Sequence, residues 1–196
     1  SIPLAAGTYD VEYQGTANVT TANEIPSSST VLRDIIVNKS SNTVTLGKDF
    51  TVTRDFKITT GTIALNSRTI TINGDFINNS GSATSISTST TGTFAFSGGG
   101  NDITINTECK FSNITINSTG VLTAPSSTTF NIQGNFVNNG TFTHNSGTVK
   151  FDGSSASTLS GSAQTNFKNL TITSGKTLNG VHCKRYLYSG KQYSYF

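Results

Sequence analysis

A long internal repeat constrains the fold of this chain more than any other feature of its sequence. Three blocks return in the same order about 55 to 60 residues later, although the chain has only 196 residues. The first copies occupy 69–79, 92–98 and 111–118, and the second copies occupy 129–139, 147–153 and 167–174. A duplication in fixed order is typical of stacked structural units rather than of chance composition.

A shorter period lies inside this repeat, in pairs of apolar residues that stand two positions apart. Examples are Val44/Leu46, Phe50/Val52, Phe56/Ile58, Ile63/Leu65 and Ile70/Ile72, which are followed by Phe76. Each pair indicates a short strand that turns two side chains inward and its polar residues outward. Three such strands occupy about 19 to 20 residues, which predicts that Val44 and Ile63, Phe50 and Ile70, and Phe56 and Phe76 lie one coil apart.

The pattern predicts an all-β chain that folds as a right-handed parallel β-helix, a three-sided β-solenoid with about 19–20 residues per coil. On this interpretation the long repeat is three coils, and some ten coils would stack into a rod of about 45 to 50 Å. A sandwich of antiparallel hairpins is the structural alternative. It is less favoured because Asn-Gly turns are sparse and the apolar pairs recur at near-constant spacing.

The predicted organisation has three parts: an N-terminal cap with the first coils at 1–30, solenoid repeats at 31–178, and an atypical C-terminal tail or cap at 179–196. The tail is rich in tyrosine and cations. It is a closing cap, a strand donated to a neighbouring subunit, or a segment outside the native repeat. The candidate assembly or adhesion residues are Tyr186, Tyr188, Tyr193, Tyr195 and Phe196.

Composition narrows the classes of function. Ser, Thr and Asn make up about two-fifths of the chain, which is far from average usage, and charged residues make up 12%. The net charge of +3 is not gathered into a basic stripe before the last twenty or so residues, so nucleic-acid binding is not expected. No apolar run is long enough to span a bilayer. Two cysteines, Cys109 and Cys183, are too few for a disulfide scaffold, and their redox state stays open.

The repeated blocks resemble a known group of proteins. Blocks such as GTFAFSG, FKNLTITSG and ITINGDFINN are similar to the repeats of large bacterial cell-surface and secreted proteins, which are predicted to form parallel β-helices like those of adhesins. The resemblance implies export, residence at the extracellular or bacterial cell surface, and an adhesive or scaffolding role. It implies no catalytic centre, because the shared pattern consists of packing residues.

Carboxylates are the first candidates for chemistry, because some β-helices cleave polysaccharides with a pair of acids. Asp55 and Asp75 each precede a core Phe one predicted coil apart, and Asp49 sits one strand earlier. The equivalent of Asp75 in the second copy is Asn135, and Asp or Asn beside a strand is ordinarily a turn residue. We therefore expect turn residues here and not a catalytic pair.

The other candidate sites are weaker. His144 and His182 have no nucleophile motif nearby, and the single SGGGND stretch at 97–102 resembles a calcium-binding repeat but needs neighbouring copies to make a site. T-x-T pairs such as Thr69/Thr71, Thr141/Thr143 and Thr171/Thr173 invite comparison with ice-binding solenoids. These pairs are expected to fall on more than one face, which makes ice binding a remote alternative.

The sequence therefore predicts an extracellular structural or adhesive β-solenoid module and not an enzyme. Self-association is expected, with end-to-end stacking into a surface filament as one form of it, and surface glycans are a further candidate partner. A carbohydrate-binding or carbohydrate-active β-helix is the main alternative from another class. No cofactor, metal, nucleic acid or membrane span is expected, and the sequence does not identify the binding target.

Overall fold

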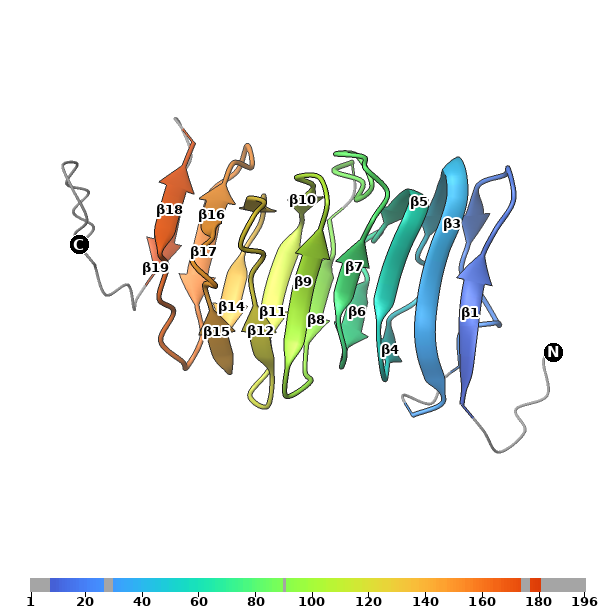
Figure 1. Ribbon diagram of the computed structural model, residues 1–196, viewed down its shortest axis with the longest axis horizontal. Coiled ribbons are helices and arrows are strands. Elements are labelled where there is room, and N and C mark those ends of the chain that lie inside the picture. Colours follow the sequence, from blue (N-terminus) through green and yellow to red (C-terminus); the bar gives the residue numbers. More distant parts are fainter. Residues whose placement is uncertain (1–7, 27–29, 90, 174–176, 181–196) are drawn as a thin grey trace.

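The fold is a rod of stacked strands. The computed structural model describes residues 8–26, 30–89, 91–173 and 177–180 of the chain. This part contains nineteen strands and no helix, and the strands stack as a parallel β-solenoid of about eight turns, with the first and the last strand at opposite ends (Figure 1). The expected all-β, three-sided parallel β-helix is confirmed, because the strands form three sheets and every pairing between them is parallel.

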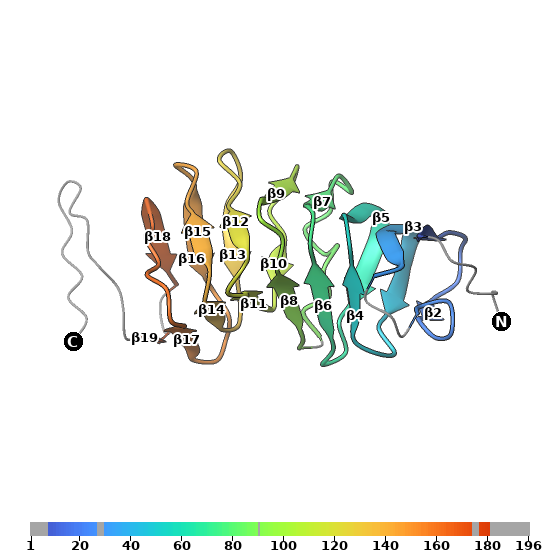
Figure 2. The ribbon, with the colours of Figure 1, turned by 90° about the horizontal axis from the view of Figure 1, so that it is seen from below.

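From residue 50 on, strands that follow one another along the chain lie in different sheets (Figure 2), and the four-stranded sheet receives strands only from Lys110 onward. The eight-stranded sheet contains β1 (Tyr9–Tyr13), β2 (Val19–Thr20), β3 (Leu32–Thr45), β5 (Phe56–Ala64), β7 (Phe76–Asn78), β9 (Asn101–Ile105), β12 (Val121–Thr123) and β15 (Thr141–Thr143). The four-stranded sheet contains β10 (Lys110–Phe111), β13 (Phe130–Ile132), β16 (Thr148–Phe151) and β18 (Asn169–Ile172). The seven-stranded sheet contains β4 (Phe50–Val52), β6 (Thr69–Ile72), β8 (Thr93–Phe96), β11 (Asn113–Ile116), β14 (Phe136–Asn138), β17 (Ser157–Ser160) and β19 (Leu178–Gly180).

The apolar pairs of the sequence set the register between coils. Phe50 is the partner of Ile70, and Phe56 is the partner of Phe76, as predicted. The third predicted pair, Val44 with Ile63, is also in register. These pairings are parallel and about one coil apart in sequence, so the antiparallel sandwich is wrong.

Coil length is less regular than predicted. The step from Phe50 to Ile70 is 20 residues, but the step from Ile70 to Phe94 is 24, and the step from Phe76 to Ile103 is 27. The longest coil contains the Ser- and Thr-rich segment 79–92, which forms only an isolated bridge at Ile86. Because such loops lengthen the coils, the chain makes about eight turns, and the expectation of some ten was wrong.

The long repeat does not equal three coils, which corrects a second expectation. The first copies lie on β6, β8 and β11 of the seven-stranded sheet, whereas their second copies lie on β13, β16 and β18 of the four-stranded sheet. Each strand of the four-stranded sheet is followed directly along the chain by a strand of the seven-stranded sheet. One repeat is therefore two full turns plus two of the three faces of a third turn. For this reason a motif in the seven-stranded sheet reappears in the four-stranded sheet, which precedes it in the turn.

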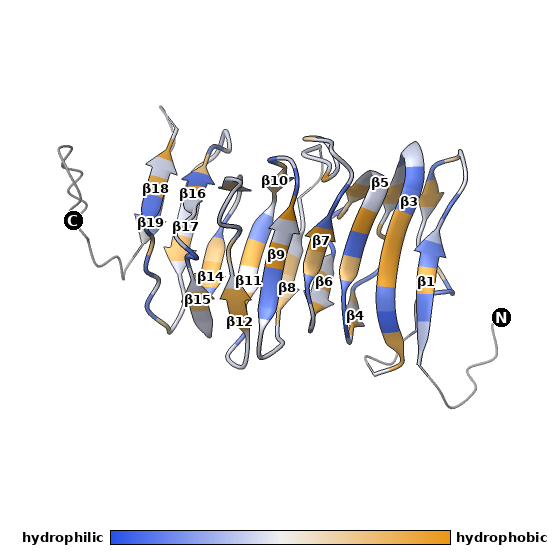
Figure 3. Cartoon of the chain, in the orientation of Figure 1, coloured by the Kyte–Doolittle hydropathy of each residue, from blue (hydrophilic) through white to orange (hydrophobic). Residues whose placement is uncertain are grey.

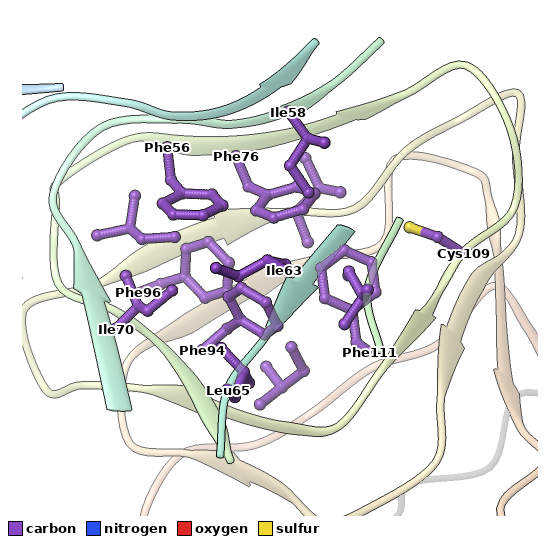
Figure 4. Packing of buried hydrophobic residues seen from close by; sticks show 14 of the residues in the cluster. Phe56, Ile58, Ile63, Leu65, Ile70, Phe76, Phe94, Phe96, Cys109 and Phe111 are labelled. Atoms are coloured by element: carbon purple, nitrogen blue, oxygen red, sulfur yellow. The ribbon is translucent and has the colours of Figure 1, made fainter. Parts of the chain in front are cut away.

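The core is a continuous file of phenylalanine and aliphatic side chains along the rod axis (Figure 4). The ring of Phe76 lies 5.9 Å from Phe56, 5.4 Å from Phe94 and 4.9 Å from Phe111, measured between ring centroids. All four rings are fully buried. Aromatic contacts of this kind add to the stabilisation from burial and link each coil to the next.

The two ends of the rod differ. At the N-terminal end Ile25 is buried, and the Glu24 carboxylate accepts hydrogen bonds from the Tyr13 hydroxyl (2.8 Å) and the Ala22 backbone N–H (2.8 Å), so this segment closes the first coil. At the other end Leu170 pairs with the core residue Val149 but remains 36% exposed. Within the described residues, the last coil therefore shows part of its apolar interior.

Candidate interaction surface

Asp55 and Asp75, which invited a catalytic interpretation, belong to a ladder of aspartates along one corner of the solenoid. Each carboxylate accepts a hydrogen bond from the backbone N–H of the aspartate on the next coil: Asp10 from Asp34 (3.2 Å), Asp34 from Asp55 (3.0 Å), Asp55 from Asp75 (3.0 Å) and Asp75 from Asp102 (2.9 Å). The prediction that Asp55 and Asp75 stack on adjacent coils, each beside a strand, is confirmed. One oxygen of each carboxylate in the ladder accepts a backbone N–H of the next coil and so links the two coils. Asp49 lies outside the ladder and accepts a hydrogen bond from the Thr69 backbone N–H (3.0 Å).

Cations neutralise the first rungs of this ladder. Two nitrogens of Arg33 donate hydrogen bonds to the Asp10 carboxylate. The Lys57 Nζ lies 3.4 Å from a carboxylate oxygen of Asp34 and 3.1 Å from one of Asp55. The hydrogen bond from Arg33 lowers the pKa of the Asp10 carboxyl, although partial burial opposes it. Partial burial lowers the pKa of Lys57, but its bond to Asp55 and the charge of Asp34 more than offset this and raise it. A lowered carboxyl pKa is the opposite of what a general acid needs near neutral pH.

A second charged cluster covers the four-stranded sheet. Lys150 lies 3.4 Å from Glu108 and 3.3 Å from Asp152, and Lys110 also lies 3.3 Å from Asp152. The buried Asn131 amide donates to both carboxylates. Burial alone would raise the pKa of Asp152, but the bonds from Asn131 and the two lysines lower it. The cluster is balanced, with two positive and two negative side chains.

The remaining predicted candidates are turn residues or lie outside the described residues. His144 accepts a hydrogen bond from the Ser146 N–H through Nδ1 (3.0 Å), within a turn. In the 97–102 stretch, Asn101 is buried and donates to the carbonyl oxygens of Ile72 and Gly74. Outside the described residues lie Tyr186, Tyr188, Tyr193, Tyr195, Phe196, Cys183 and His182.

The described chain also contains one shallow depression and a buried thiol. Its residues form no group of three or more metal-ligating side chains, and none of its segments is a helix that could cross a membrane. A shallow depression of about 380 Å³ is lined by Ser, Thr and Gly of three coils, among them Ser40, Thr60 and Ser82, without an ionisable side chain. Cys109 is buried beside Asn78, and burial raises the pKa of its thiol to about 11.

Charge is distributed unequally among the three sheets. The strands of the eight-stranded sheet contain Asp, Glu, Lys and Arg, and those of the four-stranded sheet contain Lys110 and Lys150. No strand of the seven-stranded sheet contains a charged residue. Figure 3 shows hydrophilic colour concentrated on strands such as β1, β3 and β9 of the eight-stranded sheet. We call the outward side of β4, β6, β8, β11, β14 and β17 the uncharged face.

A single column of short side chains runs along the middle of the uncharged face. Strand register places its six members side by side on successive coils: Thr51, Thr71, Ala95, Thr115, Val137 and Ser160. Within the described chain, no hydrogen bond engages the hydroxyl groups of its Thr and Ser members. Ala95 is only 5% exposed and the other five members are partly exposed, so the column presents mainly the methyl groups and unpartnered hydroxyl groups of those five, on strands about 4.8 Å apart.

This column was missed in the sequence because its members share no motif. The T-x-T pairs do fall on different faces, as expected: Thr69/Thr71 on β6, Thr141/Thr143 on β15, and Thr171 on β18. Ala95 and Val137 join the column only because variable coil lengths bring them into register with threonines. The sequence did contain one signal of this face. The segments that carry the apolar pairs of the seven-stranded sheet, such as Phe50/Val52 and Ile70/Ile72, contain no charged residue.

The chain matches no protein-family model, no curated protein and no solved structure.

Proposed function

We propose that this chain is an extracellular structural and adhesive solenoid module, and that it acts by presenting an extended face on a stiff rod instead of by catalysis. The observation that carries the proposal is the uncharged face, which extends over six coils and contains no charged residue in its strands. A continuous sheet on a solenoid makes a regular contact surface, and such surfaces are the usual means by which solenoids bind.

The carbohydrate-active alternative has less support. The acid ladder is bonded to the backbone, and Asp55 and Asp75 belong to it. The largest side chains of the core, which are phenylalanines, are turned inward, so the uncharged face offers no aromatic ring for stacking on a sugar. End-to-end stacking also has less support than lateral contact, because Ile25 closes one end of the rod.

The test is adhesion measured together with hydrolysis. Beads coated with the chain are mixed with one another and with immobilised polysaccharide, and clustering, retention and release of reducing ends are recorded. An adhesive module gives clustering or retention without release of reducing ends. Release of sugar ends, or beads that neither cluster nor attach, would contradict the proposal.

A further inference from the structure

We infer that the uncharged face is a contact surface for a second copy of this chain, so that two solenoids pair laterally through it. The inference rests on the proposed adhesive function and names its partner. The pairing requires that the uncharged face costs less free energy to remove from water than the other two faces. It also requires that the side chains of the face let two copies approach closely, and that the area they bury is consistent with the affinity of the dimer.

Charge singles out this face from the other two. A contact through the eight-stranded sheet would cover Arg33 and Lys57, and a contact through the four-stranded sheet would cover Lys110 and Lys150. Removing such charges from water is costly unless the partner supplies matching groups. The chain also carries a net charge of +3, so two copies repel weakly. A contact limited to the strands of the uncharged face avoids this cost and keeps the charged clusters in solvent, because the nearest charges, Asp49 and Arg68, lie at its edge, just before β4 and β6.

The side chains of the face suit a copy of itself. In the column, Thr71, Ala95, Thr115 and Val137 are all short, so no long side chain stands between two facing sheets. Most homodimers are related by a twofold axis. An axis through the middle of the six ranks brings Ala95 and Thr115 of one copy opposite the same pair of the other. The unpartnered threonine hydroxyls then both donate and accept across the contact, which lowers the cost of covering them.

The area of the face indicates a weak contact. The six strands of the face, each about 4.8 Å wide, cover about 29 Å along the rod, and four residues of extended chain cover about 13 Å across it. This gives about 400 Å² per copy and about 800 Å² in total, below the roughly 1,200 Å² of stable complexes. We therefore expect a dimer that forms only at high concentration in solution. Many copies held on one surface would reach that concentration locally.

The test compares two pairs of matched substitutions by sedimentation velocity over a concentration series of the full chain. Thr71→Lys with Thr115→Lys places two charges in the column. Thr104→Lys with Thr143→Lys adds the same charge at outward threonines of β9 and β15. The expected result is a weak wild-type dimer whose dissociation constant rises at least tenfold with the first pair and less than twofold with the second. Strict monomers at the highest concentration, or equal effects of the two pairs, would overturn the inference.

Two further measurements distinguish loss of the contact from loss of folding, and the proposed lateral contact from a contact at the end of the rod. First, each variant is shown to unfold at the wild-type urea midpoint. Second, Thr115→Cys is tested for an intermolecular disulfide, which peptide mapping should locate at position 115, and Thr104→Cys is the control. Dimers abolished by Leu170→Ser and unaffected by Thr71→Lys/Thr115→Lys would place the contact at the open end and overturn the inference. Beads that cluster although the free chain stays monomeric would overturn only this inference and leave the proposed adhesive function standing.

Discussion

Replacing Asp55 tests whether the acid ladder is structural. Asp55→Ala removes the acceptor of the Asp75 N–H (3.0 Å) and a partner of Lys57 (3.1 Å). A hydrogen bond to a charged group contributes about 1.5 to 3 kcal/mol. The ion pair adds about 0 to 1 kcal/mol, because the Lys57 and Asp55 side chains are 29% and 20% exposed and solvent screens them. We expect a loss of about 2 to 3 kcal/mol in the free energy of unfolding.

Asp55→Asn separates the acceptor from the charge. The amide oxygen still accepts the Asp75 N–H, as Asn113 already does for the Asn135 N–H (2.8 Å), so we expect a loss of only about 1 kcal/mol. Asp102→Ala is the control, because Asp102 is the last rung and its carboxylate holds no further backbone N–H in the described chain. Urea unfolding followed by far-UV circular dichroism measures all three. An Asn variant as unstable as the Ala variant, or an Ala variant within about 0.5 kcal/mol of wild type, would refute the ladder.

Three more predictions concern the core and the closed end. Phe76→Ala empties the centre of the aromatic file and should lower the free energy of unfolding by about 3 to 5 kcal/mol, measured by urea unfolding; a loss below about 1.5 would show that the file is not continuous. Cys109 should resist thiol reagents at pH 7 to 8 until urea unfolds the chain, because burial raises its pKa to about 11; rapid labelling of its peptide in the folded chain would contradict this burial. Burial and the hydrogen bond to Glu24 raise the pKa of Tyr13. The stabilisation by this tyrosine is therefore complete below pH about 10 and is lost as the pH rises above that value. Tyr13→Phe should make the free energy of unfolding less sensitive to pH above about 10, and a variant with the wild-type alkaline profile would contradict this prediction.

The sequence was sufficient for the architecture and for the local role of the acids. Apolar residues two apart are buried together by a strand, and their near-constant spacing from Val44 to Phe76 determined which strands would pair there. This is why Phe50 with Ile70 and Phe56 with Phe76 were predicted in register. The stacking of Asp55 on Asp75 follows from the same register, because each precedes an inward Phe.

The candidate surface was beyond the sequence for a physical reason. Polar loops add residues to a coil without changing its core, so 79–92 lengthened one turn and shifted the later strands away from a constant sequence period. Which outward residues share a column depends on that shift. Thr71, Ala95 and Thr115 therefore became neighbours although no common motif marks them.

The stacking of coils along the uncharged face is tested most directly by a distance between its two ends. Spin labels are attached at Thr51 and Ser160 in a chain whose native cysteines are replaced, and their separation is measured by pulsed electron paramagnetic resonance. The register places these positions five strand spacings apart, at about 24 Å, and a rigid solenoid gives a narrow distribution near that value. A broad distribution, or a distance far from 24 Å, would contradict the continuous face on which the proposed function depends.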